Sequence, residues 1–99
     1  MGAVITMADE KLAYTLTDRA TWLNVGGDTD LQIVCEKDLS GIFNNQYGVI
    51  CVNPENNENM NAAGAKDFQN WILSAETQKL IGTYGTEEYG APLFTPNAK

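Results

Sequence analysis

The residues best suited to chemistry lie between Thr15 and Arg19, where a short strand over residues 13–16 is expected to lead through a loop into a helix. The loop offers the hydroxyls of Thr15, Thr17 and Thr21, the guanidinium of Arg19 and the free backbone N–H groups of a helix start. Together these donors would suit an oxyanion. The loop would also lie at the carboxyl end of a strand, where open α/β sheets bind ligands. The residue types therefore predict a small anion site.

The same stretch also fits a purely structural interpretation. Asp18 is a favoured N-cap residue for a helix that begins near Ala20, and Arg19 would then lie in a solvated first turn. Threonine is common in strands and caps. Arg19 could equally form a salt bridge with Asp18 or with a helix, and spacing alone does not separate these alternatives.

Helices are expected on both sides of this loop. Residues 1–12 predict a helix, and its apolar face is formed by Val4, Ile5, Ala8 and Leu12. Gly2, near the start of that helix, would let a ligand approach the backbone closely. A short helix over residues 20–25 follows the loop, and the glycine pair at 26–27 is expected to end it with the positive φ of a C-cap.

Two more strands are expected, at residues 30–36 and 47–52, and Pro54 closes the second. Each contains one cysteine, Cys35 and Cys51, and their neighbours favour buried, apolar thiols, although a bridge between adjacent strands is an alternative. Residues 37–46 read as a loop. Residues 55–59 read as a surface turn and not as a metal site.

The last part of the chain predicts two helices and an extended tail. Asn61 and Ser74 are the expected N-caps. The helices carry an apolar stripe that is expected to be core: Ala62, Ala65, Phe68, Trp71, Ile72, Leu80, Ile81 and Tyr84. Residues 86–99 show no helical period.

Composition excludes several classes of function. The formal charge of −7, from thirteen acidic and six basic residues, argues against nucleic acid and against anionic membrane surfaces. No apolar run approaches the roughly 20 residues of a membrane span, and no signal peptide is expected in this chain. Because the chain has no His, no phosphate loop and no Gly-x-Ser-x-Gly turn, we expect no enzyme.

Four segments resemble, in order and spacing, the carboxyl-terminal part of the solute-binding subunits of tungstate ABC importers. They are MGAVITMADEKLAYTLTDRATWL, YGVICVNP, NAAGAKDFQNWI and YGAPLFTPNAK. The resemblance implies an α/β fold, namely a fragment of a two-lobed, type II periplasmic-binding-protein fold with a short sheet flanked by helices. Residues 1–46 would belong to the second lobe, 47–54 would be a hinge crossover strand, and 55–99 would return to the first lobe.

The resemblance also implies a ligand and partners. The ligand would be tungstate, with molybdate as a possible competitor, and neither a cofactor nor a metal cation is expected. Thr15, Thr17, Asp18, Arg19 and Gly2 are the residues to which a binding role carries over. The full-length protein would be periplasmic or extracytoplasmic and lipid-anchored, and it would deliver its ligand to an ABC permease.

Most oxyanion contacts in that family come from two loops that this sequence lacks. The chain alone is therefore expected to bind tungstate weakly or not at all, and to associate with itself or with the missing amino-terminal half. Two alternatives remain at this point. One is the ligand-sensing domain of a transcription regulator, and the other is a free-standing interaction domain without a small ligand.

Overall fold

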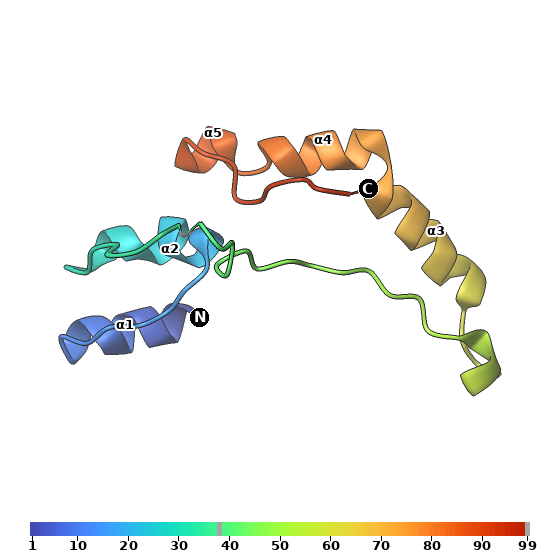
Figure 1. The fold of residues 1–99 in the computed structure, drawn as a ribbon, viewed down its shortest axis with the longest axis horizontal. Coiled ribbons are helices and arrows are strands. Elements are labelled where there is room, and N and C mark those ends of the chain that lie inside the picture. The colour runs from blue at the N-terminus through green and yellow to red at the C-terminus, as the bar shows by residue number, and fades with distance from the viewer. Residues whose placement is uncertain (38, 99) are drawn as a thin grey trace. The chain divides into compact units, whose positions relative to one another are not determined.

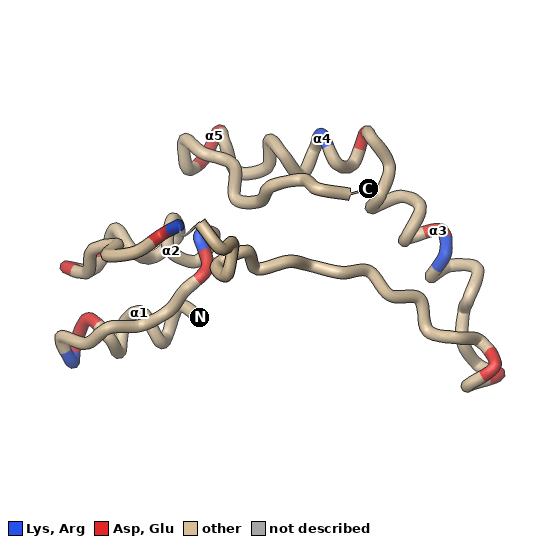
Figure 2. Tube along the Cα trace, viewed as in Figure 1, with Lys and Arg blue, Asp and Glu red and all other residues tan. Residues whose placement is uncertain are grey.

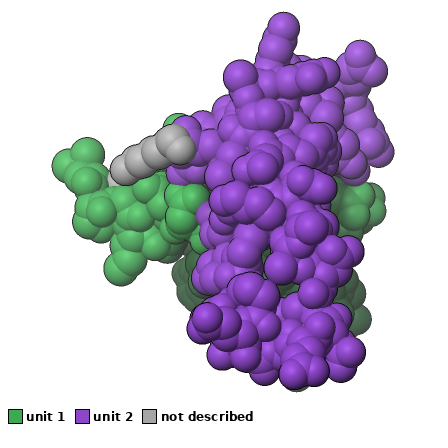
Figure 3. Space-filling model, turned by 90° about the vertical axis from the view of Figure 1, so that its right-hand side faces the viewer, with its two compact units in different colours: residues 1–46 green, residues 47–99 purple. Residues whose placement is uncertain are grey.

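The computed structural model describes residues 1–37 and 39–98, and their regular structure is helical (Figure 1). In chain order the elements are α1 (Gly2–Glu10), α2 (Arg19–Val25), the 3-10 turns η1 (Gly26–Asp28) and η2 (Pro54–Asn56), α3 (Ala62–Leu73), α4 (Ala75–Thr83) and α5 (Thr86–Tyr89). The chain divides into two compact units, Met1–Gln46 and Tyr47–Lys99, which Figure 3 shows in green and purple.

None of the residues that the structure describes lies in a β-strand. The strands expected at 13–16, 30–36 and 47–52 are therefore absent, and the predicted sheet is not confirmed. A strand exists only through hydrogen bonds to a neighbouring strand, which can lie far away in sequence. These three segments contain β-forming residues, but none of them pairs with a neighbouring strand within the described residues.

Helix α1 ends earlier than expected, in a Schellman-type turn. Ala13 N–H donates to the Ala8 carbonyl at 2.9 Å, Leu12 N–H donates to the Asp9 carbonyl at 3.1 Å, and Leu12 takes a left-handed φ of 52°. Leu12 is consequently 91% exposed and does not join the predicted apolar face. Of the predicted face, Ile5 and Ala8 are buried, and they are the buried hydrophobic side chains among the residues that the structure describes.

Helices α1 and α2 pack on one another in unit 1. Figure 1 shows that they run in the same direction, with the segment between them returning along α1, so that both helices begin at the same end of the unit. The positive ends of two helix dipoles therefore lie on one side of unit 1.

The glycines after α2 have a different role from the one expected. Gly26 has a φ of −65°, so it continues the helical turn into η1 and supplies no left-handed C-cap. Its small size matters because an added Cβ would lie 2.5 Å from two ring atoms of Trp22. Gly27 has open space at the same position. Gly26 therefore lets the Trp22 ring cover the end of its own helix.

The two N-caps expected in unit 2 are confirmed. Asn61 Oδ1 accepts from Gly64 N–H at 2.9 Å at the start of α3, and Ser74 Oγ accepts from Thr77 N–H at 3.3 Å at the start of α4. The tail differs from expectation, because residues 86–89 form the single turn α5. Gly85 and Gly90, both with positive φ, flank this turn.

The apolar stripe of α3 and α4 is not a core in this chain. Phe68 and Trp71 are each 53% exposed, and Leu80 and Tyr84 are each 59% exposed. The cysteines also differ from expectation, since Cys35 is exposed and Cys51 is partly exposed, both as free thiols. An amphipathic helix buries its face only when a second layer lies against it, and sequence does not supply that layer.

Replacing Gly26 with Ala should destabilise unit 1 by about 1–3 kcal/mol, because the new methyl group overlaps the Trp22 ring. Gly27→Ala is the matched control and should be neutral or slightly stabilising, since its added Cβ meets nothing within 4 Å. Urea unfolding followed by Trp22 fluorescence in a Trp71→Phe background measures both. Equal effects of the two variants would contradict this account of Gly26.

Candidate functional site

The loop that leads into α2 is organised by Asp18. Its Oδ1 accepts from Thr21 N–H at 2.8 Å, and its Oδ2 accepts from the Thr21 hydroxyl at 2.8 Å, while its backbone is extended. The N-cap interpretation of Asp18 is therefore confirmed. Both carboxylate oxygens and the Thr21 hydroxyl are used inside the loop itself.

These hydrogen bonds also set the charge of Asp18. The Thr21 backbone N–H is the largest influence and lowers the pKa of the Asp18 carboxyl below its ordinary 3.8, with the Thr21 hydroxyl acting in the same direction against partial burial. Asp18 therefore stays ionised at neutral pH. Because an ionised carboxylate repels an oxyanion, Asp18 orients the loop and is unsuited to direct contact with an anion.

Arg19 pairs with a residue that sequence spacing did not indicate. Its Nη2 forms an ion pair with Glu36 Oε1, whereas the partners considered from sequence were Asp18 and a helix. The two side chains are 45% and 44% exposed, so solvent screens the pair and its contribution to stability is small. The guanidinium has five N–H donors in a planar fork, and the pair with Glu36 holds that fork beside the loop.

The two threonine hydroxyls of the loop make only long contacts. Thr15 Oγ1 donates to the Leu16 carbonyl and Thr17 Oγ1 to the Asp18 carbonyl, each at 3.4 Å. Hydroxyl hydrogen bonds are normally 2.5–3.0 Å long, so both contacts are weak. Thr15 is exposed and Thr17 is half-buried. Their hydroxyls could therefore turn to another acceptor or to an anion at small cost.

Gly2 is the first residue of α1, and an added Cβ there would meet nothing within 4 Å. The backbone is accordingly open to close approach. Because α1 and α2 begin at the same end of unit 1, the Gly2 end of α1 and the loop before α2 share one side of that unit (Figure 1). The structure thus brings the start of α1 and the start of α2 to one side of unit 1, and Asp18 caps α2 there.

The electrostatic setting is acidic. Figure 2 shows Asp and Glu along both units, with fewer Lys and Arg among them. Within residues 1–37 and 39–98, no three His, Cys, Asp or Glu side chains lie close enough together to hold a metal ion. No helix of this described part is long and apolar enough to cross a membrane.

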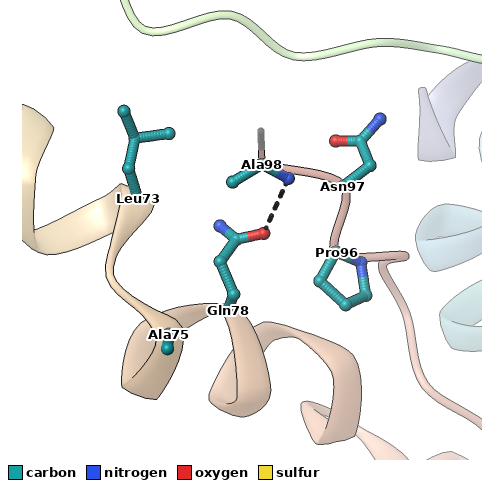
Figure 4. A pocket seen from close by; sticks show the side chains of 6 residues that line it. All are labelled: Leu73, Ala75, Gln78, Pro96, Asn97 and Ala98. Carbon is teal, nitrogen blue, oxygen red and sulfur yellow. Dashed lines mark hydrogen bonds between the residues drawn. The ribbon is translucent and has the colours of Figure 1, made fainter.

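Two pockets lie in unit 2. One of about 320 Å³ is lined by Leu73, Ala75, Gln78, Pro96, Asn97 and Ala98 (Figure 4). Another of about 240 Å³ is lined by Ile50, Cys51, Val52, Met60, Asn61, Ala62 and Ala65. Neither of these two pockets includes the loop before α2.

Comparison with known proteins identifies the class to which this chain belongs. The model of the PBP superfamily domain matches residues 1–76, which is most of the chain. The chain therefore belongs to the PBP superfamily. No solved structure gives a significant match.

Individual relatives carry more specific names. The tungstate-binding protein TupA of Peptoclostridium acidaminophilum is 61% identical over 98 residues, covering 99% of this chain and 34% of the relative. The tungstate-binding protein TupA of Campylobacter jejuni is 37% identical over 103 residues, covering 100% of this chain and 37% of the relative. A candidate ABC transporter anion-binding protein of Haloferax volcanii is 39% identical over 101 residues, covering 99% of this chain and 29% of the relative.

These findings confirm the resemblance to tungstate-binding proteins. The chain spans about a third of the length of the curated relatives that it matches. The structure agrees with a PBP-type fold only in part, because the regular structure of the described residues is helical and includes no strand.

Replacing Asp18 with Ala should destabilise unit 1 by about 1 kcal/mol at neutral pH, the usual cost of a lost N-cap. Asp18→Asn is the matched control, because it keeps a capping oxygen without a titrating charge. The pKa of Asp18 is lowered in the folded state, so its contribution is present above the ordinary pKa of 3.8 and is lost as the pH falls through the folded-state pKa.

Urea unfolding of the three proteins, followed by Trp22 fluorescence in a Trp71→Phe background, measures this difference at each pH. The stability of the wild-type protein relative to Asp18→Asn should fall as the pH drops below 3.8. A constant difference between these two proteins would mean that the Asp18 carboxylate does not cap α2.

Proposed function

We propose that this chain is part of an extracytoplasmic solute-binding protein of an ABC importer that captures tungstate. The observation that carries the proposal is the 61% identity, over nearly the whole chain, to the Peptoclostridium tungstate-binding protein. On this proposal the oxyanion is enclosed between two lobes, molybdate competes with tungstate, and the loaded protein delivers its ligand to a membrane permease. The full-length protein would be periplasmic or lipid-anchored.

The chemistry of the loop before α2 supports an oxyanion ligand. A tetrahedral dianion is held well by hydroxyl and N–H donors, because hydrogen bonds to an ion are roughly twice as strong as neutral ones. Thr15 and Thr17 offer hydroxyls that are held only by 3.4 Å contacts. Arg19 offers a cation, and the open backbone at Gly2 offers N–H groups at the start of α1.

Asp18 and Glu36 act indirectly in this proposal. Asp18 shapes the loop by capping α2, and its charge is offset by the Thr21 donors. The Glu36 carboxylate engages Nη2 of the Arg19 guanidinium, so an incoming oxyanion competes with this carboxylate for the N–H donors of Arg19. Unit 1 alone therefore offers a weak site, to which the remainder of the longer protein would add further donors.

The remainder of the protein would also complete the fold. On this proposal residues 1–46 belong to the second lobe, residues 47–54 cross between the lobes as a strand, and residues 55–99 pack on the first lobe. Ile50 is 88% exposed and Val52 is 57% exposed, which suits a strand awaiting a sheet. The half-exposed Phe68 and Trp71 of α3 would be covered by the first lobe.

Isothermal titration calorimetry with tungstate tests the proposed ligand. The chain alone should give little or no heat, because most of the donors lie outside it. The chain mixed with the part of the Peptoclostridium relative that lies outside the 98 aligned residues should bind tungstate. Tight binding by the chain alone would place the whole site in the loop before α2, and no heat in either case would favour a free-standing interaction domain.

Variants of the mixture test the proposed residues. Arg19→Gln should weaken tungstate binding about tenfold or more, since a charge-assisted hydrogen bond is worth about 1.5–3 kcal/mol. Lys11→Gln removes the same charge from the residue that follows α1 and is the matched control. If both variants weaken binding equally, net charge and not the loop governs the affinity.

Fluorescence of Trp71 tests the proposed cover over α3. In a Trp22→Phe background, the half-exposed Trp71 should emit at long wavelength in the chain alone and shift to shorter wavelength when the complementary part is added. The same shift in the chain alone at rising concentration would indicate that a second copy covers this face. An unchanged spectrum in a mixture that binds tungstate would place Trp71 outside the interface.

A further inference from the structure

The C-terminal segment of unit 2 folds back along α4. Leu93 N–H donates to the Tyr84 carbonyl at 3.0 Å, and Ala98 N–H donates to Gln78 Oε1 at 3.1 Å. The segment is therefore antiparallel to α4, as Figure 1 shows. Figure 4 shows the hydrogen bond between Ala98 and Gln78. Gln78 Nε2 also donates to the Ile72 carbonyl at 2.8 Å, so the Gln78 side chain links the tail to the last turn of α3.

Two glycines of this region let the tail lie close to α4. A Cβ added at Gly82 would lie 3.1 Å from Pro96 Cγ, and a Cβ added at Gly85 would lie 2.6 Å from Leu93 Cγ. Each glycine therefore faces one apolar side chain of the tail. The tail is therefore held at Leu93 by a backbone hydrogen bond and by the close contact with Gly85, at Pro96 by the close contact with Gly82, and at Ala98 by the hydrogen bond to the Gln78 side chain.

Phe94 connects the docked tail to a distant part of unit 2. Its ring centroid lies 6.4 Å from that of Tyr84, at the end of α4, and 6.3 Å from that of Tyr47, with the Tyr47 ring nearly perpendicular at 87°. Both distances are within the range of favourable aromatic pairs. Tyr47 is the first residue of unit 2 and of segment 47–54.

We propose that residues 91–98 form a strap whose Phe94 holds the start of segment 47–54 against the end of α4. Undocking of the strap removes the ring contact of Tyr47 with Phe94 and loosens the point where the chain enters unit 2. If segment 47–54 is the crossover between two lobes, a reading that rests on the proposed function, the strap sets the stiffness of that crossover. The contacts of the strap described above all lie within unit 2.

Limited digestion of the 99-residue chain by chymotrypsin tests the strap, because this protease must take the Tyr47 ring into its apolar specificity pocket. When opening is fast relative to cleavage, the rate of cleavage reports the population in which the ring is released. Cleavage after Tyr14, which is 90% exposed, is the internal reference in each digest. Mass spectrometry gives the ratio of the two rates.

Phe94→Ala should raise the ratio of Tyr47 to Tyr14 cleavage roughly two- to tenfold, the factor that corresponds to one aromatic pair. The factor is modest because Tyr47 packs by one edge and remains 71% exposed. Phe68→Ala is the matched control, since Phe68 contacts Trp71 on α3 and should leave the ratio unchanged. The assay needs no tungstate, so its result is independent of the proposed ligand.

Far-UV circular dichroism of each variant establishes that its helices persist. If Phe94→Ala loses helix, Phe94→Leu takes its place, because it keeps the apolar bulk and removes the ring, and a rise in the ratio is again expected. An unchanged ratio in the folded Phe94 variant, or an equal rise in Phe68→Ala, would overturn the strap.

Discussion

The small apolar area buried within the described residues is the constraint on which the rest of this structure depends. Ile5 and Ala8 are the buried apolar side chains of the described residues, whereas the aromatic residues of α3 remain half-exposed. Burial of apolar area is the main favourable term in folding, so helices with so little of it rely on local interactions. The N-caps at Asp18, Asn61 and Ser74 satisfy helix ends where packing contributes little.

The same shortage bears on the candidate site. Two sets of polar contacts order the loop before α2: the Asp18 cap within the loop, and the ion pair between Arg19 and the more distant Glu36. Its donors are consequently placed but open to water, where each hydrogen bond to an anion is partly offset by lost hydration. An acidic chain can still contribute to an oxyanion site, because hydroxyls, backbone amides and one guanidinium next to the ligand outweigh carboxylates beyond a screening length of about 8–10 Å.

In unit 2 the C-terminal tail is held by individual hydrogen bonds and side-chain contacts rather than by burial in a core. The tail gains its place from two hydrogen bonds, from two glycines that leave room for Leu93 and Pro96, and from the rings around Phe94. Apart from the ring contact between Phe94 and Tyr47, these contacts join the tail to α4 and to the residues just after it. The outer face of α3 has no comparable set of contacts in the described chain. This difference accounts for a docked tail beside an exposed aromatic stripe.

The sequence by itself determined features that depend on neighbouring residues, namely helices α1 to α4 and the three N-caps. It also determined the membership of the PBP superfamily. Tertiary structure decided what depends on distant residues. Glu36 reaches Arg19 across 17 positions, the Trp22 ring requires Gly26 to be small, and the segments expected as strands stay unpaired because strand pairing needs a partner from elsewhere. The helical spacing of apolar residues placed Phe68 and Trp71 on the apolar face of α3. This spacing does not indicate which other part of a protein would bury that face. Local hydrogen bonds depend on residues that are close in sequence. Burial and strand pairing instead require that parts of the chain distant in sequence come into contact.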